Sequence, residues 1–154
     1  MTHVGAHPRA LLFVSVSVIA LLAASPEVRG ADLSRAPIIA KAPVATSWAL
    51  TQTLPADNTA AGLPAADKIV SNYISSVLVQ DGAIHITFGN RVNSILKDKI
   101  LTIRPAVVDD APVVPVTWVC GTAEAPDKMT VKGVNKTDIE AGYLPFSCRA
   151  RSTK

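Results

Sequence analysis

Aromatic side chains and clustered positive charge are both scarce in this chain of 154 residues. Phe, Trp and Tyr make up 5% of the residues, and 15 Lys and Arg stand against 12 Asp and Glu, for a net charge of +3. Apart from Arg149, Arg151 and Lys154 at the end of the chain, no basic run is present. Because nucleic acids are bound through clustered basic faces and stacked aromatic rings, the sequence indicates no nucleic-acid partner.

Histidine and cysteine are also sparse. His85 is the only histidine outside the N-terminal segment, and Cys120 and Cys148 are the only cysteines. If the cysteines bond to each other, the remaining residues supply neither a zinc cluster nor a Cys/His nucleophile. No glycine-rich phosphate loop occurs, and a Ser-His-Asp site has no motif support. We therefore expect no enzyme activity, no catalytic residue, no cofactor and no metal.

The N-terminus has the three parts of a secretory signal peptide. A short basic stretch ends at Arg9, a mainly apolar run covers Ala10–Ala24, and a polar exit leads to Gly30. The small residues Val28 and Gly30 suit a signal-peptidase site, which predicts a signal peptide over 1–30 and cleavage before Ala31. The apolar run is shorter than the about 20 residues that a membrane span needs. Retention of the segment as an inner-membrane anchor is the alternative.

An exported chain with two cysteines most simply forms one disulfide. Cys120 ends a strand-like run, and Cys148 lies close to the C-terminus. Their bond would close the loop Gly121–Ser147 and would stabilise the fold by roughly 3–4 kcal/mol in the chain-entropy model.

The first part of the exported chain predicts a single short helix. Residues 31–43 contain two prolines and no clear period, so we expect an extended lead-in. A helix over Val44–Thr53 follows, and it ends before Pro55 because proline disfavours helical geometry in the preceding residue. Residues that share one face of this helix are Val44, Trp48 and Thr51 or Gln52.

The clearest local pattern is a β-hairpin. The runs Ile74–Gln80 and Ala83–Phe88 are separated by Asp81-Gly82, which supplies the positive φ angles of a type I′ turn. Pairing outward from the turn sets Val79 opposite Ile84, Val77 opposite Ile86, and Ser75 opposite Phe88. This register collects the apolar side chains, Phe88 included, on one face.

The opposite face of the hairpin carries Ser76, Leu78, His85 and Thr87, which are mostly polar. We therefore expect an antiparallel sheet with one solvated side and His85 exposed on it.

Two further strands complete the predicted sheet. The third covers Lys99–Arg104 and ends at Pro105, and the fourth covers Val113–Cys120 after a turn at 109–112. The sequence thus predicts a single α+β domain, in which a short N-terminal helix packs on a four-stranded antiparallel sheet with a C-terminal disulfide-bonded loop.

Several phrases, taken in order, resemble the globular domain of type IV pilins. They are the loop Leu54–Pro64, the hairpin with Tyr73-Ile74-Ser75-Ser76-Val77 and Ile86-Thr87-Phe88-Gly89-Asn90, the strand Lys99–Pro105, Val116-Thr117-Trp118-Val119-Cys120, and Tyr143-Leu144-Pro145 before Cys148-Arg149. The resemblance covers about Val44–Arg149. It implies a pilin-like globular domain over 44–154.

The resemblance also carries expectations about function. Pilins begin with a leader that ends in glycine, followed by a long apolar helix whose fifth residue is glutamate. Here Ala10 is the fifth residue after Gly5, and prolines interrupt the stretch before Leu54. We therefore expect an accessory pilin-like protein of the type IV pilus and cell-adhesion system that does not polymerise by itself and that docks on other pilus subunits or the pilus machinery. The alternatives are a free periplasmic or secreted binding module, and a rearranged or misassigned start.

The family places its variable, receptor-contacting surface between the cysteines, so Gly121–Ser147 is the candidate contact surface. We expect an exported protein in the periplasm, the pilus or the extracellular space, with a membrane contact only if the signal segment is retained.

Three other features have ordinary structural explanations. Asp109-Asp110 suits a turn better than a calcium site, and Asn135-Lys136-Thr137 matches a glycosylation sequon by chance. Trp48 and Trp118 suit the core.

Overall fold

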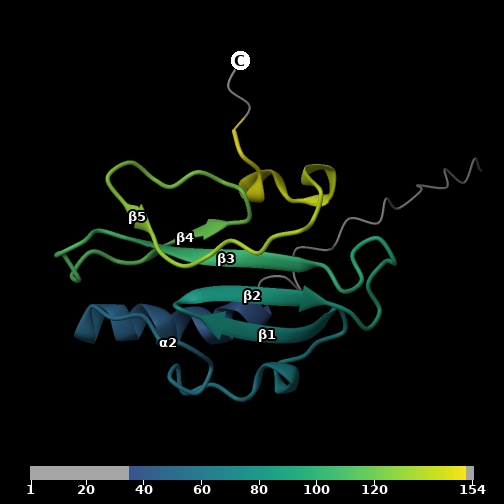
Figure 1. Cartoon of the computed structure of the whole chain (residues 1–154), viewed down its shortest axis with the longest axis horizontal. Helices are drawn as coiled ribbons and strands as arrows, with labels where there is room; N and C mark the ends of the chain where they lie inside the picture. Colours follow the sequence, from purple (N-terminus) through teal and green to yellow (C-terminus); the bar gives the residue numbers. More distant parts are fainter. Residues whose placement is uncertain (1–34, 152–154) are drawn as a thin grey trace, which may run out of the picture.

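The computed structural model describes residues 35–151, with side chains from Ile39 onward. One helix, α2 (Arg35–Thr51), precedes an antiparallel sheet in the order β1-β2-β3-β4. The strands are β1 (Ile74–Gln80), β2 (Ala83–Phe88), β3 (Ile100–Val107) and β4 (Thr117–Cys120). Figure 1 shows α2 behind the sheet and the C-terminal part of the chain in front of β3. The α+β architecture is confirmed, while the signal peptide lies outside the described residues.

The helix is longer than the sequence pattern predicts. It includes residues 35–43, so the expected extended lead-in is wrong from Arg35 onward, and Pro43 lies inside the helix. Proline removes one backbone donor and costs about 3 kcal/mol in a helix interior. Burial of Ala40, Val44 and Trp48 along one face offsets this cost, since packing rather than propensity stabilises most helices in proteins.

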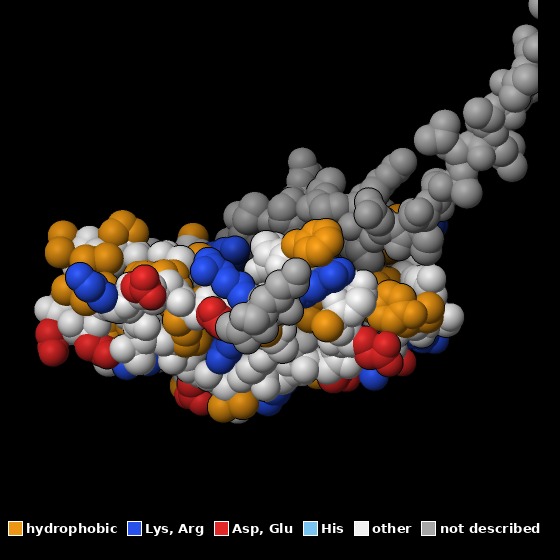
Figure 2. Space-filling view, turned by 90° about the horizontal axis from the view of Figure 1, so that it is seen from above, with side chains coloured by type: hydrophobic (Ala, Val, Ile, Leu, Met, Phe, Trp, Pro, Cys, Tyr) orange, Lys and Arg blue, Asp and Glu red, His pale blue; other side chains and the backbone are white. Residues whose placement is uncertain are grey.

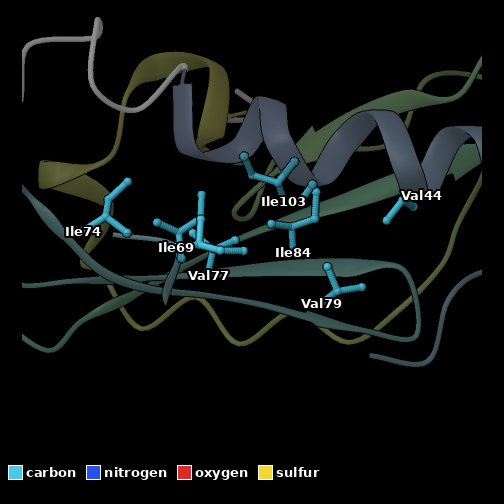
Figure 3. Close-up of a cluster of buried hydrophobic side chains, with 9 residues drawn as sticks. Val44, Ile69, Ile74, Val77, Val79, Ile84 and Ile103 are labelled. Atoms are coloured by element: carbon cyan, nitrogen blue, oxygen red, sulfur yellow. The ribbon is translucent and has the colours of Figure 1, made fainter. Parts of the chain in front are cut away.

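The main core lies between this face of α2 and the sheet. Figure 3 shows Val44 from the helix above Val79 and Ile84 of the hairpin, with Ile103 of β3 beside them. All five hairpin side chains assigned to the apolar face are buried, as predicted; they are Val77, Val79, Ile84, Ile86 and Phe88.

The hairpin register is confirmed near the turn and shifts away from it. Val79 pairs with Ile84 and Val77 with Ile86, but a bulge between Ile74 and Ser76 sets Ile74 opposite Phe88. The predicted pairing of Ser75 with Phe88 is therefore wrong. A bulge adds one residue to one strand, and here it brings an isoleucine rather than a serine to the buried face.

The later strands depart from their predicted bounds. β3 continues through Pro105, which pairs with Trp118 of β4, to Val107, and β4 is shorter than expected. An unpredicted two-residue strand, β5 (Thr130–Val131), pairs with the end of β3. The sheet thus gains a fifth strand from within the disulfide-closed loop.

The outer edge of β1 is closed by a side chain. Asn58, only 6% exposed, donates from Nδ2 to the carbonyl of Val77 at 3.0 Å, and its Oδ1 accepts from the backbone N–H of Val79 at 2.6 Å. Its amide also donates to the carbonyl of Pro64. The carboxamide therefore pairs with the edge as one residue of a neighbouring strand would, which blocks further strand addition there.

Replacement of the proline inside α2 tests the explanation of the helix. Pro43→Ala restores the missing donor, so we expect the free energy of unfolding to rise by about 2–3 kcal/mol in urea titrations. Pro115→Ala, in the exposed β3–β4 connection, is the control and should give no gain. Equal effects of the two substitutions would show that Pro43 does not oppose the helix.

Candidate functional site

The predicted disulfide is present and joins the end of β4 to the C-terminal turns. Cys120 and Cys148 are bonded with their Cα atoms 4.5 Å apart, and Cys148 is buried. Cys148 belongs to η3 (Phe146–Cys148), a 3₁₀ turn that follows η2 (Ala141–Tyr143). The bond therefore fixes both ends of the disulfide region, Gly121–Ser147.

The middle of the disulfide region lies across the sheet face opposite α2. After β5, the backbone N–H of Lys132 donates to Pro105 at 2.9 Å, and that of Lys136 donates to the Thr102 hydroxyl at 3.0 Å. Asp138 exchanges hydrogen bonds with the backbone of Ile100. Figure 1 shows this segment running along β3.

Thr102 is the point where this segment joins the sheet. The residue is fully buried, and its N–H donates to the Thr137 hydroxyl while its carbonyl accepts from Gly121. Its hydroxyl, besides accepting from Lys136, lies 2.9 Å from Nδ1 of His85. Four groups from three parts of the chain thus meet at one side chain and its backbone.

The prediction that His85 is exposed on a solvated face is wrong. His85 is 3% exposed, because the segment after β5 covers the face that the hairpin pattern left polar. Burial and the neighbouring Lys136 ammonium, in that order, lower the pKa of His85 to about 4. Its Nε2 has no hydrogen-bond partner among the described residues. The residue is therefore a neutral part of the core at physiological pH.

The sequon residues are used for packing. Asn135 donates from Nδ2 to the carbonyl of Gly121 at 2.9 Å, and its Oδ1 accepts from the N–H of Thr137. Thr137 itself is bonded to Thr102. Because the amide that would carry a glycan is engaged with the backbone, this arrangement supports the interpretation that the sequon match is accidental.

The acidic pair after β3 is divided between two environments. Both carboxylate oxygens of Asp109 are engaged, one by the Lys132 ammonium at 2.8 Å and the other by the Thr130 hydroxyl at 2.7 Å. These hydrogen bonds lower the pKa of Asp109. Asp110 has a φ of 60°, and no ion pair joins it to the described residues. Within residues 35–151, no group of three metal-binding side chains is present.

The outward side of the disulfide region presents apolar and aromatic side chains. Val134, Tyr143 and Phe146 are 65%, 51% and 88% exposed. The Arg149 guanidinium lies 4.5 Å from the Phe146 ring centroid and donates to the carbonyls of Leu144 and Gly142. Figure 2 looks onto this side and shows hydrophobic and basic side chains next to each other. These three exposed side chains lie within the predicted contact surface, Gly121–Ser147.

The two tryptophans occupy the core side of the sheet, as expected. Trp48 is 6% exposed on α2, and Trp118 of β4 is half-buried against the main core. The Lys41 ammonium lies 5.5 Å from the Trp118 ring centroid, and burial lowers the pKa of Lys41. The helix and the far edge of the sheet are joined by this contact.

The sequence of the folded domain matches a known class of protein. The family model of pilins, which form bacterial filaments, matches residues 39–149, and the chain belongs to this family. The chain is 30% identical over 101 residues to the type IV major pilin protein PilE of Neisseria gonorrhoeae, with 62% of this chain and 58% of that protein covered. It is 30% identical over 104 residues to a fimbrial protein of Neisseria meningitidis, with 62% and 59% covered. The chain thus spans less than two thirds of the length of both relatives.

Family membership also bears on whether the protein is an enzyme. The chain is a structural, non-enzymatic protein, in agreement with the prediction from its sparse histidine and cysteine. Among residues 35–151, none of the helices has both the length and the apolar character required to cross a bilayer.

Acid stability tests the assignment of His85 as a neutral core residue. Its pKa is about 4 in the folded chain and about 6.5 when unfolded. The unfolded state therefore binds the proton first as the pH falls below 6.5, and stability is lost between pH 6.5 and pH 4. From pH 7 to pH 5 we expect a loss of about 2 kcal/mol from this group in urea titrations.

His85→Gln, which keeps an acceptor for the Thr102 hydroxyl but does not titrate, is the matched control. All carboxylates are the same in both proteins, so the difference between their stability losses isolates the contribution of the histidine. Identical stability losses from pH 7 to pH 5 would contradict the assignment.

Proposed function

We propose that this chain is a structural subunit of a type IV pilus that is exported to the cell surface and assembles with other pilin subunits. Membership of the pilin family and the similarity to two Neisseria pilus proteins support this proposal. The observation that carries it furthest is the outward face of α2.

The outward face of α2 is uncharged over its described length. Ile39, Ala42, Thr46, Ala49 and Leu50 are exposed, at the three- and four-residue spacing of one helix face. Ile39 is 52% and Leu50 78% exposed. Helix faces that meet water usually carry charged residues. The small side chains between the two larger ones also allow a second helix to approach closely. This face therefore suits burial against a helix of another pilin subunit.

The accessory, non-polymerising role expected from the sequence relied partly on prolines ending any helix before Val44. Because α2 includes Pro43 and residues on both sides of it, that part of the reasoning no longer applies. We therefore favour a subunit that assembles through its helix over an accessory protein that does not polymerise by itself.

A free periplasmic or secreted binding module is the second candidate. It is favoured by the coverage of both sheet faces, which leaves the main core buried within a single subunit. The contact surface in that case would be the outward side of the disulfide region, with Tyr143 and Phe146, facing a receptor. The two candidates predict different locations: a pilus subunit is found in fibres, and a free module is found in the periplasm or the culture medium.

The test is the amount of the full-length chain in fibres sheared from cells that express it beside a type IV pilus system. Ala49→Glu places a carboxylate on the outward face of α2, where burial of an unpaired charge costs several kcal/mol. We expect at least about a tenfold loss from the fibre fraction, equivalent to 1.4 kcal/mol. Ala60→Glu, on the exposed loop after α2, is the control and should leave the amount unchanged.

Both variants should keep the melting temperature of the unaltered protein. If the unaltered chain were missing from fibres and recovered in the periplasmic or culture fraction, the free-module candidate would replace the subunit. Equal incorporation of both variants would remove α2 as the assembly face.

A further inference from the structure

We propose that two copies of this chain make a heterologous contact, in which the turn 143–149 of one copy binds the turn 108–114 of the next. The inference extends the proposed pilus function, because it names a second contact between subunits besides the helix. It comes from two exposed turns that carry complementary side chains.

Each turn presents an apolar side chain to solvent. Val113, at 89%, and Phe146, at 88%, are the two most exposed large hydrophobic side chains among the described residues. A single exposed apolar residue is common on protein surfaces. These two residues differ from the others in two ways. Each lies on a well-fixed turn, and each has a charged residue beside it, one acidic and the other basic.

The neighbouring charges are complementary. Asp110 lies close to Val113 in sequence, and Arg149 stacks on Phe146. Neither forms an ion pair within residues 35–151. A contact that brings Val113 onto the free face of the Phe146 ring would place the two charges near each other at its rim. Complementary rim charges set orientation and partner choice more than affinity.

Both turns are held in place before any contact forms. The first is tied to β5 through Asp109, whose carboxylate binds Thr130 and Lys132. The second is held by the Cys120–Cys148 disulfide and by the two hydrogen bonds of Arg149 to Leu144 and Gly142. Preorganised turns lose little conformational entropy on binding.

The positions of the turns favour a second copy over an unrelated partner. Figure 1 places the β3–β4 connection at one end of the long axis and the η2–η3 turns on the upper side of the molecule, away from that end. Figure 2 shows hydrophobic and acidic side chains together at the first end. Two different patches that complement each other on one chain make a heterologous contact, which continues from copy to copy as an open assembly.

Photo-crosslinking in fibres tests the contact directly. The full-length chain carries a benzophenone-bearing phenylalanine analogue at position 146, a conservative replacement, and sheared fibres are irradiated and analysed by peptide mass spectrometry. We expect crosslinks to the peptide that contains Val113 of another copy. The same analogue at position 134, exposed on the same region, is the control and should not reach that peptide.

A charge test accompanies the crosslinking. Asp110→Asn removes the charge and tolerates the positive φ of this position. We expect it to reduce the Val113 crosslink by about threefold or more, whereas Asp127→Asn, on an exposed loop, should not change it.

The remaining outcomes overturn the contact in different ways. Crosslinks from position 146 to another segment, another protein or a glycan would overturn the pairing and leave the pilus assignment standing. The same holds if the chain enters fibres and no crosslink forms. If the unaltered chain never enters fibres, the proposed function fails, and the contact fails with it.

Discussion

The structure depends above all on the hydrogen bonds that converge on Thr102. This residue is fully buried in β3, and its hydroxyl and backbone join β2, the end of β4 and the segment after β5. Each neutral hydrogen bond contributes only about 1 kcal/mol net. The cost of leaving several buried groups unpaired is larger, so the segment that covers the sheet has one favourable position.

That constraint explains why the inward and outward side chains of the disulfide region have different surroundings. Inward side chains, such as Asn135 and Thr137, hold the backbone to the sheet. Outward side chains, such as Tyr143 and Phe146, are left free for contacts. The Cys120–Cys148 bond fixes the ends of the region, and the Thr102 bonds fix its middle.

Much of the fold could be predicted, because local rules govern it. Asp81-Gly82 fixed the hairpin, and alternation fixed its buried face. The prediction went wrong where contacts distant in sequence decide the result. The burial of His85 depends on residues 132–138, about fifty positions later, and no local pattern of β2 carries that information. A polar Thr102 opposite His85 on neighbouring strands was the available signal of a covered polar pair.

The helix is a second case in which contacts distant in sequence override the local pattern. Pro37 and Pro43 predicted an extended chain, and local propensity supports that prediction. The buried side chains of Ala40 and Val44 override it by packing on strands that come later in the chain. The proposed contact surface could be predicted only as a region, because the exposure of Phe146 and its stacking with Arg149 depend on the turns at the C-terminus.

Amide hydrogen exchange of Thr102→Val measures the central constraint most directly. The substitution keeps the shape of the side chain and removes the hydroxyl that accepts from Lys136. If Thr102 holds the covering segment in place, protection of the Lys136 amide should fall by tenfold or more, equivalent to about 1.4 kcal/mol, while amides shared by β1 and β2 change much less. Unchanged protection at Lys136, or an equal loss throughout the sheet, would contradict this account.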